Sequence, residues 1–217
     1  MIFTWDDSYK ICEMDEAFIR TYLQKLPFAV DRGLAGKLLA YLDLLVKWNK
    51  AYNLTAIRSP DEMLTHHILD SLVVSSYLEG PRILDVGTGP GFPGLPLAML
   101  RSEYQFILLD SNAKKTRFVS QAVLELGLEN VEVVTSRVEN YEREQVVNTV
   151  ISRAFSRLDE FVQKTSRFCV KKGLLIAMKG RYPSEEIASL GPDFKADIVK
   201  TEVPDLNAER HLVLVRL

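Results

Sequence analysis

The chain has 217 residues, of which 47% are hydrophobic, and its formal net charge at pH 7 is −2. This composition supplies a sizeable core, as in one domain with an extension. It excludes a uniformly basic nucleic-acid coat but not a local basic face. Cys12 and Cys169 match no CxxC pattern and are typical of reduced thiols. We find no signal peptide and no apolar run that would span a bilayer, so we expect a cytoplasmic protein without membrane contact. No feature of the sequence demands an oligomer, so we expect a monomer, although the oligomeric state stays open.

The first 80 residues are predicted to form a helical extension, residues 1–80. Apolar side chains recur with a helical period in two segments, residues 18–23 and 38–48. A third helix is predicted to begin at Ser59, which is placed to cap it, with Pro60 in the first turn and Glu62 completing a capping box. This helix is expected to run to about residue 77.

From residue 81 onward, strands alternate with helices, which predicts a second unit over residues 81–217. The expected strands are residues 83–86, 106–109, 131–134, 147–151, 174–178, 196–203 and 211–215. An amphipathic helix is expected over residues 113–126, and another helix carries Leu158 and Phe161. This alternation predicts an α/β fold, a mostly parallel sheet with helices on both faces. The last two strands are expected to form an antiparallel hairpin at the sheet edge.

A glycine-rich turn follows the first predicted strand, at Gly87, Gly89, Gly91 and Gly94. Glycine there lets the backbone approach a ligand closely, but the GxGxxG pattern within it also fits dinucleotide sites. Asp85 distinguishes a dinucleotide from S-adenosylmethionine. The pyrophosphate of a dinucleotide gains nothing from a nearby carboxylate, whereas the α-ammonium and sulfonium groups of S-adenosylmethionine are attracted by it. The bulky Phe92 also argues against a pyrophosphate. The turn therefore favours S-adenosylmethionine, with a dinucleotide or a purely structural turn as alternatives.

Three further positions are predicted to complete such a pocket. Asp110 ends the next strand and suits ribose hydroxyls, or alternatively caps the following helix. Val138 and Glu139 follow the third strand and suit an adenine edge, although Glu139 also reads as an ordinary surface acid. Arg153 follows the fourth strand at the mouth of the sheet, where its alternative role is a surface salt bridge.

Several motifs together carry a family resemblance. They are residues 48–57 (WNKAYNLTAI), 67–72 (HILDSL), the loop 85–94, Asp110-Ser111 with Lys114 and Lys115, residues 152–154, Lys179-Gly180 and residues 209–211. Over nearly its whole length the chain resembles the bacterial small-subunit ribosomal RNA guanine-N7 methyltransferases, the glucose-inhibited division protein B family. One small departure is Val138, where the family usually carries a smaller residue.

The resemblance implies a Rossmann-like class I S-adenosylmethionine-dependent methyltransferase. It implies methyl transfer to N7 of a specific guanine in 16S ribosomal RNA, free or within the small ribosomal subunit. By carry-over, the cofactor pocket is lined by Gly87, Phe92, Val138, Glu139 and Arg153. The resemblance also implies that three basic residues face the RNA, namely Arg137, Lys179 and Arg210.

Guanine N7 has a lone pair and no proton, so its methylation needs orientation rather than a general base. We accordingly assign no catalytic residue and no metal site, and we interpret the three histidines as core or cap residues. Residues 152–181 hold eight basic residues against two acids, which predicts positive potential for RNA, with Lys164 and Lys171 expected only to solvate a helix face. The roles of Asn53 and Asp70 stay open between ordering the entrance and capping helices.

Other functions remain open at this stage. A methyltransferase acting on small molecules or on proteins would use the same loop. A ribosome-assembly factor that keeps the fold but has lost methyl transfer should fail to bind the cofactor. A dinucleotide oxidoreductase would instead bind NAD and transfer hydride.

Overall fold

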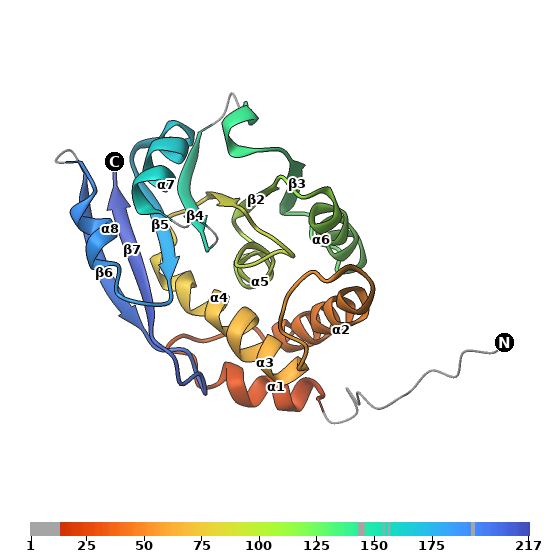
Figure 1. Cartoon of the computed structure of the whole chain (residues 1–217). Coiled ribbons are helices and arrows are strands. Elements are labelled where there is room, and N and C mark those ends of the chain that lie inside the picture. Colours follow the sequence, from red (N-terminus) through yellow and green to blue (C-terminus); the bar gives the residue numbers. More distant parts are fainter. Residues whose placement is uncertain (1–13, 143–145, 154, 156, 192–193) are drawn as a thin grey trace.

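The computed structural model describes residues 14–142, 146–153, 155, 157–191 and 194–217 (Figure 1). Cys12 and Ala154, which entered the sequence predictions, lie outside these residues. The strands are β1 (Arg82–Val86), β2 (Gln105–Asp110), β3 (Val131–Thr135), β4 (Val147–Ser152), β5 (Cys169–Lys179), β6 (Lys195–Thr201) and β7 (Arg210–Arg216). Each contains most of a predicted strand.

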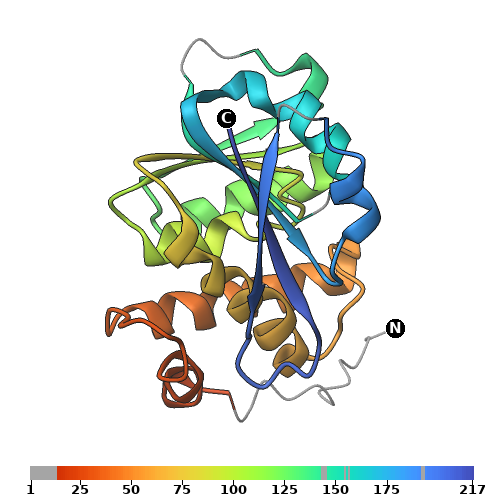
Figure 2. The same ribbon diagram turned by 90° about the vertical axis from the view of Figure 1, so that its left-hand side faces the viewer.

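The described strands form one seven-stranded sheet in the order β3-β2-β1-β4-β5-β7-β6. Strands β1 to β5 pair in parallel, and β7 pairs antiparallel with both β5 and β6. The predicted hairpin is therefore confirmed, with β6 at the edge that Figure 2 turns toward the viewer. All the parallel strands end on one side of the sheet, which is where ligands bind in open α/β sheets.

Helices cover both faces of the sheet, as predicted (Figure 1). They are α1 (Glu16–Leu23), α2 (Leu34–Tyr52), α3 (Pro60–Met63), α4 (Asp70–Leu72), α5 (Gly94–Leu100), α6 (Ala113–Glu125), α7 (Leu158–Thr165) and α8 (Ser184–Ala188). Alternate strand residues serve the two faces, because side chains along a strand point to opposite sides. Ile83 and Phe106 join a core with the N-terminal helices, α5 and α6, whereas Leu84 and Ile107 join a core with α7.

The N-terminal helices share one hydrophobic core with the sheet, since Leu38 and Leu45 of α2 belong to the same buried cluster as Ile83. The boundary at residue 80 stays a prediction. Within the described residues, no helix is long and apolar enough to cross a membrane.

The third predicted helix has a more complex course than the sequence suggested. After α3 it passes through a π-helical stretch, η1 (Leu64–Leu69), then α4, and ends in a 3-10 stretch, η2 (Val73–Tyr77). Ser59 occupies the N-cap position and Pro60 the first turn, as predicted, but the predicted capping box is wrong, because the Ser59 hydroxyl makes no cap hydrogen bond. Its carbonyl instead accepts from the Met63 N–H at 2.9 Å, so the helix ladder begins from the backbone alone.

Candidate functional site

The glycine-rich loop joins β1 to α5 and requires glycine for two different reasons. Gly91 has a φ of +105°, a backbone conformation that residues with a Cβ rarely adopt. A Cβ on Gly94 would lie 2.1 Å from a methyl carbon of Leu108 on β2, so α5 approaches the sheet too closely for any side chain there. The loop is thus shaped by backbone freedom at one position and by packing at the other.

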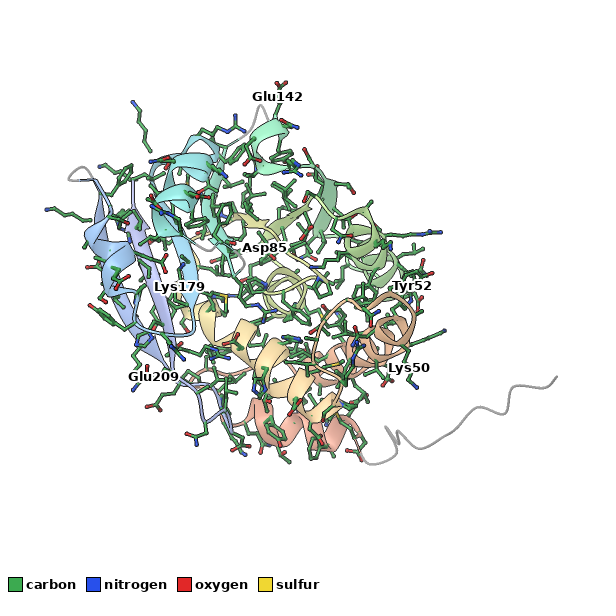
Figure 3. All side chains as sticks on the ribbon, in the orientation of Figure 1. Lys50, Tyr52, Asp85, Glu142, Lys179 and Glu209 are labelled. Carbon is green, nitrogen blue, oxygen red and sulfur yellow. The ribbon has the colours of Figure 1, made fainter. Side chains whose placement is uncertain are left out.

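Asp85 lies fully buried at the centre of the molecule, beneath the glycine loop (Figure 3). Its Oδ2 accepts a hydrogen bond from the Gly94 N–H at 2.9 Å, while its Oδ1 has no geometrically good partner among the described residues. Burial raises the pKa of Asp85 to about 7, against smaller lowering effects of the Thr88 hydroxyl and the Gly94 N–H. A buried carboxyl with an unused oxygen is suited to receive a cationic partner.

The loop rests on α2 through Tyr41, a residue that the sequence analysis did not single out. The Tyr41 hydroxyl donates to the carbonyl of Pro90 at 2.6 Å, and its ring lies 5.5 Å from that of Phe92. Burial raises the pKa of Tyr41, so the hydroxyl stays protonated and remains a donor. The only sequence signal was its place on the apolar face of a predicted helix, which does not distinguish a loop support from an ordinary core residue.

A first hollow of about 270 Å³ lies beyond the ends of β1, β2 and β3. Its lining includes Gly87, Asp110, Arg137, Val138 and Glu139, so the structure brings together the predicted ribose and adenine residues. Asp110 accepts from the N–H groups of Gly89 and Asn112, both at 2.8 Å.

The alternative role of Asp110 as a helix cap is wrong, because Asn112 caps α6 by accepting from the Lys114 N–H at 3.0 Å. Each Asp110 oxygen accepts one backbone hydrogen bond and has a lone pair left to accept another. The carboxylate is therefore both a fixed part of the loop and an available acceptor.

Two basic residues of the 152–181 stretch support the first hollow rather than presenting free charge. Lys164 pairs with Glu139 at 2.9 Å, and this contact lowers the pKa of Glu139. Arg167 donates to the carbonyls of Val138 and Glu139 at 2.8 and 3.1 Å. Lys164 and Arg167 therefore use their positive charge in contacts within the protein.

A second hollow of about 210 Å³ adjoins the first, because Gly87 lines both. Its other lining residues include Thr55, His67, Gly89, Phe92 and Arg153. The His67 ring stacks on Phe92 with centroids 4.7 Å apart, and the Arg153 guanidinium lies 5.1 Å from the centroid of the same ring. The predicted residues Phe92 and Arg153 therefore meet at this hollow.

His67 is held in one tautomer as a neutral ring. Its Nδ1 lies 3.2 Å from the His66 carbonyl, which only accepts, so Nδ1 carries the proton and Nε2 accepts from the Thr55 hydroxyl at 2.8 Å. Burial, together with the nearby charge of Arg153, lowers the pKa of His67 to about 3. Asn49 fixes Thr55 in turn by accepting from its N–H at 2.9 Å.

A third hollow of about 410 Å³ lies at the ends of β4 and β5. His67 and Arg153 line both this hollow and the second one, so the two hollows adjoin. Lys179 and Arg210 also line it, whereas Arg137 lies at the first hollow, so the three predicted RNA residues are not all brought together. Lys179 Nζ is 2.7 Å from Glu186 (Figure 3 shows Lys179 on β5).

The sheet order, the glycine loop and the linked hollows define a class I S-adenosylmethionine-dependent methyltransferase. Solved structures share the fold. An O-methyltransferase from Bacillus cereus in complex with SAH has a TM-score of 0.59 at 18% identity, covering 92% of this chain and 100% of that chain. A SAM-dependent methyltransferase from Aquifex aeolicus has a TM-score of 0.53 at 19% identity, covering 71% of this chain and 92% of that chain.

Sequence relatives define the family. A family model described as rRNA small subunit methyltransferase G (GidB) matches residues 35–213, and the chain belongs to this family. A relative of that name from Nitrosococcus oceani is 50% identical over 204 residues, 93% of this chain and 94% of the relative. Another from Salmonella schwarzengrund is 52% identical over 180 residues, 82% of this chain and 87% of the relative. The family resemblance stated from the motifs is confirmed.

Proposed function

We propose that this protein transfers a methyl group from S-adenosyl-L-methionine to N7 of a specific guanine in 16S ribosomal RNA. The observation that carries the proposal is the third hollow, where the guanidinium groups of Arg153 and Arg210 and the ammonium group of Lys179 lie next to the glycine-loop site. Relatives across most of the chain are named ribosomal RNA small subunit methyltransferase G. We further propose that the protein acts in the cytoplasm, as a monomer and without membrane contact.

The first and second hollows fit the cofactor. Asp110 offers carboxylate oxygens for ribose hydroxyls, and Val138 and Glu139 offer an apolar wall and an acceptor for an adenine edge. Gly87 joins the two hollows, and Phe92 and Arg153 line the second, where the unused Oδ1 of Asp85 lies buried beneath the loop. A buried acceptor without a partner favours a ligand that carries positive charge.

When bound, the cofactor would supply an electrophilic methyl group to the N7 lone pair, and the electron pair of its S–C bond would stay on sulfur. No proton leaves N7, so the protein need only orient the base and exclude water. The described side chains near the reaction suit that task. His67 has a pKa of about 3 and is a weak base, and burial keeps Tyr41 protonated. Cys169 is buried at the start of β5, with its pKa raised by burial to about 11.

The test is mass mapping of methylated nucleotides in small ribosomal subunits from a strain that lacks this protein, after incubation with the protein and labelled cofactor. One new N7-methylguanine, absent with the Asp85→Ala variant, is expected. Free 16S RNA incubated in parallel distinguishes the naked RNA from the assembled subunit as substrate. Cofactor binding without any label in RNA would move the proposal to a small-molecule or protein substrate.

A further inference from the structure

The third hollow contains a buried carboxylate that the cofactor site does not use. Asp70 begins α4 directly after the π-helical stretch, and its side chain is only 5% exposed. Among the described residues that line this hollow, Asp70 is the one carboxylate. The hollow is also lined by three basic side chains, Arg153, Lys179 and Arg210. Short π-helical segments within helices occur frequently at functional sites.

Asp70 holds one arginine from each side of the hollow. Its Oδ1 accepts from Nε of Arg210 at 2.8 Å, and its Oδ2 lies 3.5 Å from Nη1 of Arg153. Arg153 follows β4 and borders the second hollow, whereas Arg210 begins β7 and lines only the third. The carboxylate therefore fixes the distance between a group of the cofactor site and a group of the neighbouring hollow.

Arg210 is placed so that part of its guanidinium stays available. Its Nε is used by Asp70 and its Nη1 donates to the Glu209 carbonyl at 2.9 Å. Within the described residues, Nη2 has no hydrogen-bond partner, and the side chain is 20% exposed. A guanidinium that is fixed on one edge and open on the other is a preorganised donor for a carbonyl oxygen.

Asp70 also lowers the positive charge that an acceptor becoming cationic would meet in the hollow. Asp70 offsets one of its two arginines, and Lys179 is paired with Glu186. His67 stays uncharged at the wall shared with the second hollow, because burial and Arg153 depress its pKa. A base that gains positive charge during methylation would be opposed by a charged His67 and is favoured by the Asp70 carboxylate.

We infer that the third hollow receives the acceptor guanine, displaced from its stack, and that Asp70 is the positioning residue that holds Arg210 against the guanine O6 while N7 faces the second hollow. Guanine carries O6 and N7 on one edge, so a donor to O6 alone orients N7 without blocking it. An adenine presents an amino group at that place and would meet a donor with a donor. The inference rests on the proposed function and assigns the base recognition within it.

The first experiment is independent of methyl transfer. Guanosine monophosphate and adenosine monophosphate are each titrated into the protein loaded with S-adenosylhomocysteine, and binding is followed by saturation-transfer NMR. We expect the guanine nucleotide to bind more tightly than the adenine nucleotide, and Asp70→Asn to remove that preference. Equal binding of both nucleotides, or a preference that Asp70→Asn leaves intact, would overturn the inference even if RNA methylation is found. A preference without RNA methylation would instead contradict the proposed function alone.

The second experiment measures kcat/KM with small ribosomal subunits for Asp70→Asn, Arg210→Gln and the double variant. Each single variant is expected to lose about tenfold or more, because a buried charge cluster loses one of its members. The double variant is expected to lose no more activity than Asp70→Asn alone, since Arg210 is no longer held in place once the carboxylate is gone. In Arg210→Gln, affinity for S-adenosylhomocysteine should change less than about threefold, because Arg210 lines the third hollow and not the second.

Glu79→Gln is the matched control, because Glu79 makes an exposed ion pair with Arg216 at 2.8 Å and should leave activity unchanged. Additive losses for Asp70 and Arg210, or a loss of cofactor affinity as large as the loss of activity, would refute the positioning role. If Asp70→Asn does not fold, Arg210→Lys keeps the positive charge but lacks the planar fork. If the Arg210→Lys variant were as active as the unaltered protein, that result would also refute the positioning role.

Discussion

Raising the pH from 6 to 8 should tighten the binding of S-adenosylmethionine about tenfold through the ionisation of Asp85. The Asp85 carboxyl is fully buried, and burial raises its pKa to about 7. With that pKa, the ionised fraction rises from about one-tenth at pH 6 to about nine-tenths at pH 8. In the proposed cofactor site, only the ionised form of Asp85 would attract the ammonium and sulfonium groups, so affinity is expected to follow the ionised fraction. His67, with a pKa of about 3, stays neutral throughout this range.

The measurement is isothermal titration calorimetry across this pH range, in pairs of buffers that differ in ionisation enthalpy. At pH 6, binding should release close to one proton, and at pH 8 almost none. Asp85→Asn is the matched variant, because an amide oxygen still accepts from the Gly94 N–H but carries no charge. This variant should bind weakly at every pH. A flat pH profile in the unaltered protein, or the same slope in Asp85→Asn, would refute the reasoning.

Folding stability should depend on Asp85 with the opposite pH trend. Folding raises the pKa of this carboxyl from 3.8 to about 7. Its contribution to the free energy of unfolding is therefore fully present below about pH 4 and is lost as pH rises through about 7. The three-unit shift corresponds to a change on the order of 4 kcal/mol. Thermal melts should thus show Asp85→Asn gaining stability relative to the unaltered protein between pH 4 and pH 8, and a constant difference would contradict this.

Three further predictions follow from the loop and the RNA. Tyr41→Phe removes the hydrogen bond to the Pro90 carbonyl but keeps the ring, so unfolding free energy should fall by about 1 kcal/mol and cofactor affinity should weaken; unchanged melts and titrations would exclude this support role. Gly94→Ala forces a Cβ against Leu108, so calorimetric titration should show cofactor binding lost, and normal affinity would contradict the close packing. The logarithm of kcat/KM for ribosomal subunits should fall linearly with the logarithm of salt concentration, whereas salt-independent kinetics would argue against phosphate contacts.

The sequence alone determined the sheet and the glycine-rich loop. Most of the strands contain a short apolar run, and the loop glycines lie at fixed offsets from Asp85, so both signals lie within a few neighbouring residues. The alternation of strands and helices then left few topologies, which is why the parallel sheet and its final hairpin were predictable. The predicted cap hydrogen bond of Ser59 is absent because it depends on the direction of one hydroxyl group, which the sequence does not specify.

Only the tertiary structure decided which charges are available to a ligand. Lys164 and Lys179 look alike in a basic stretch, yet folding pairs each with a glutamate from another element. Asp70 and Arg210 are 140 residues apart, and their contact exists because the β6–β7 hairpin brings the start of β7 beside α4. Helix and strand periods are encoded between near neighbours, whereas such contacts depend on how completed elements pack. The sequence therefore determined the fold and its glycine-rich loop, and the packing decided which residues line the hollow beside that loop.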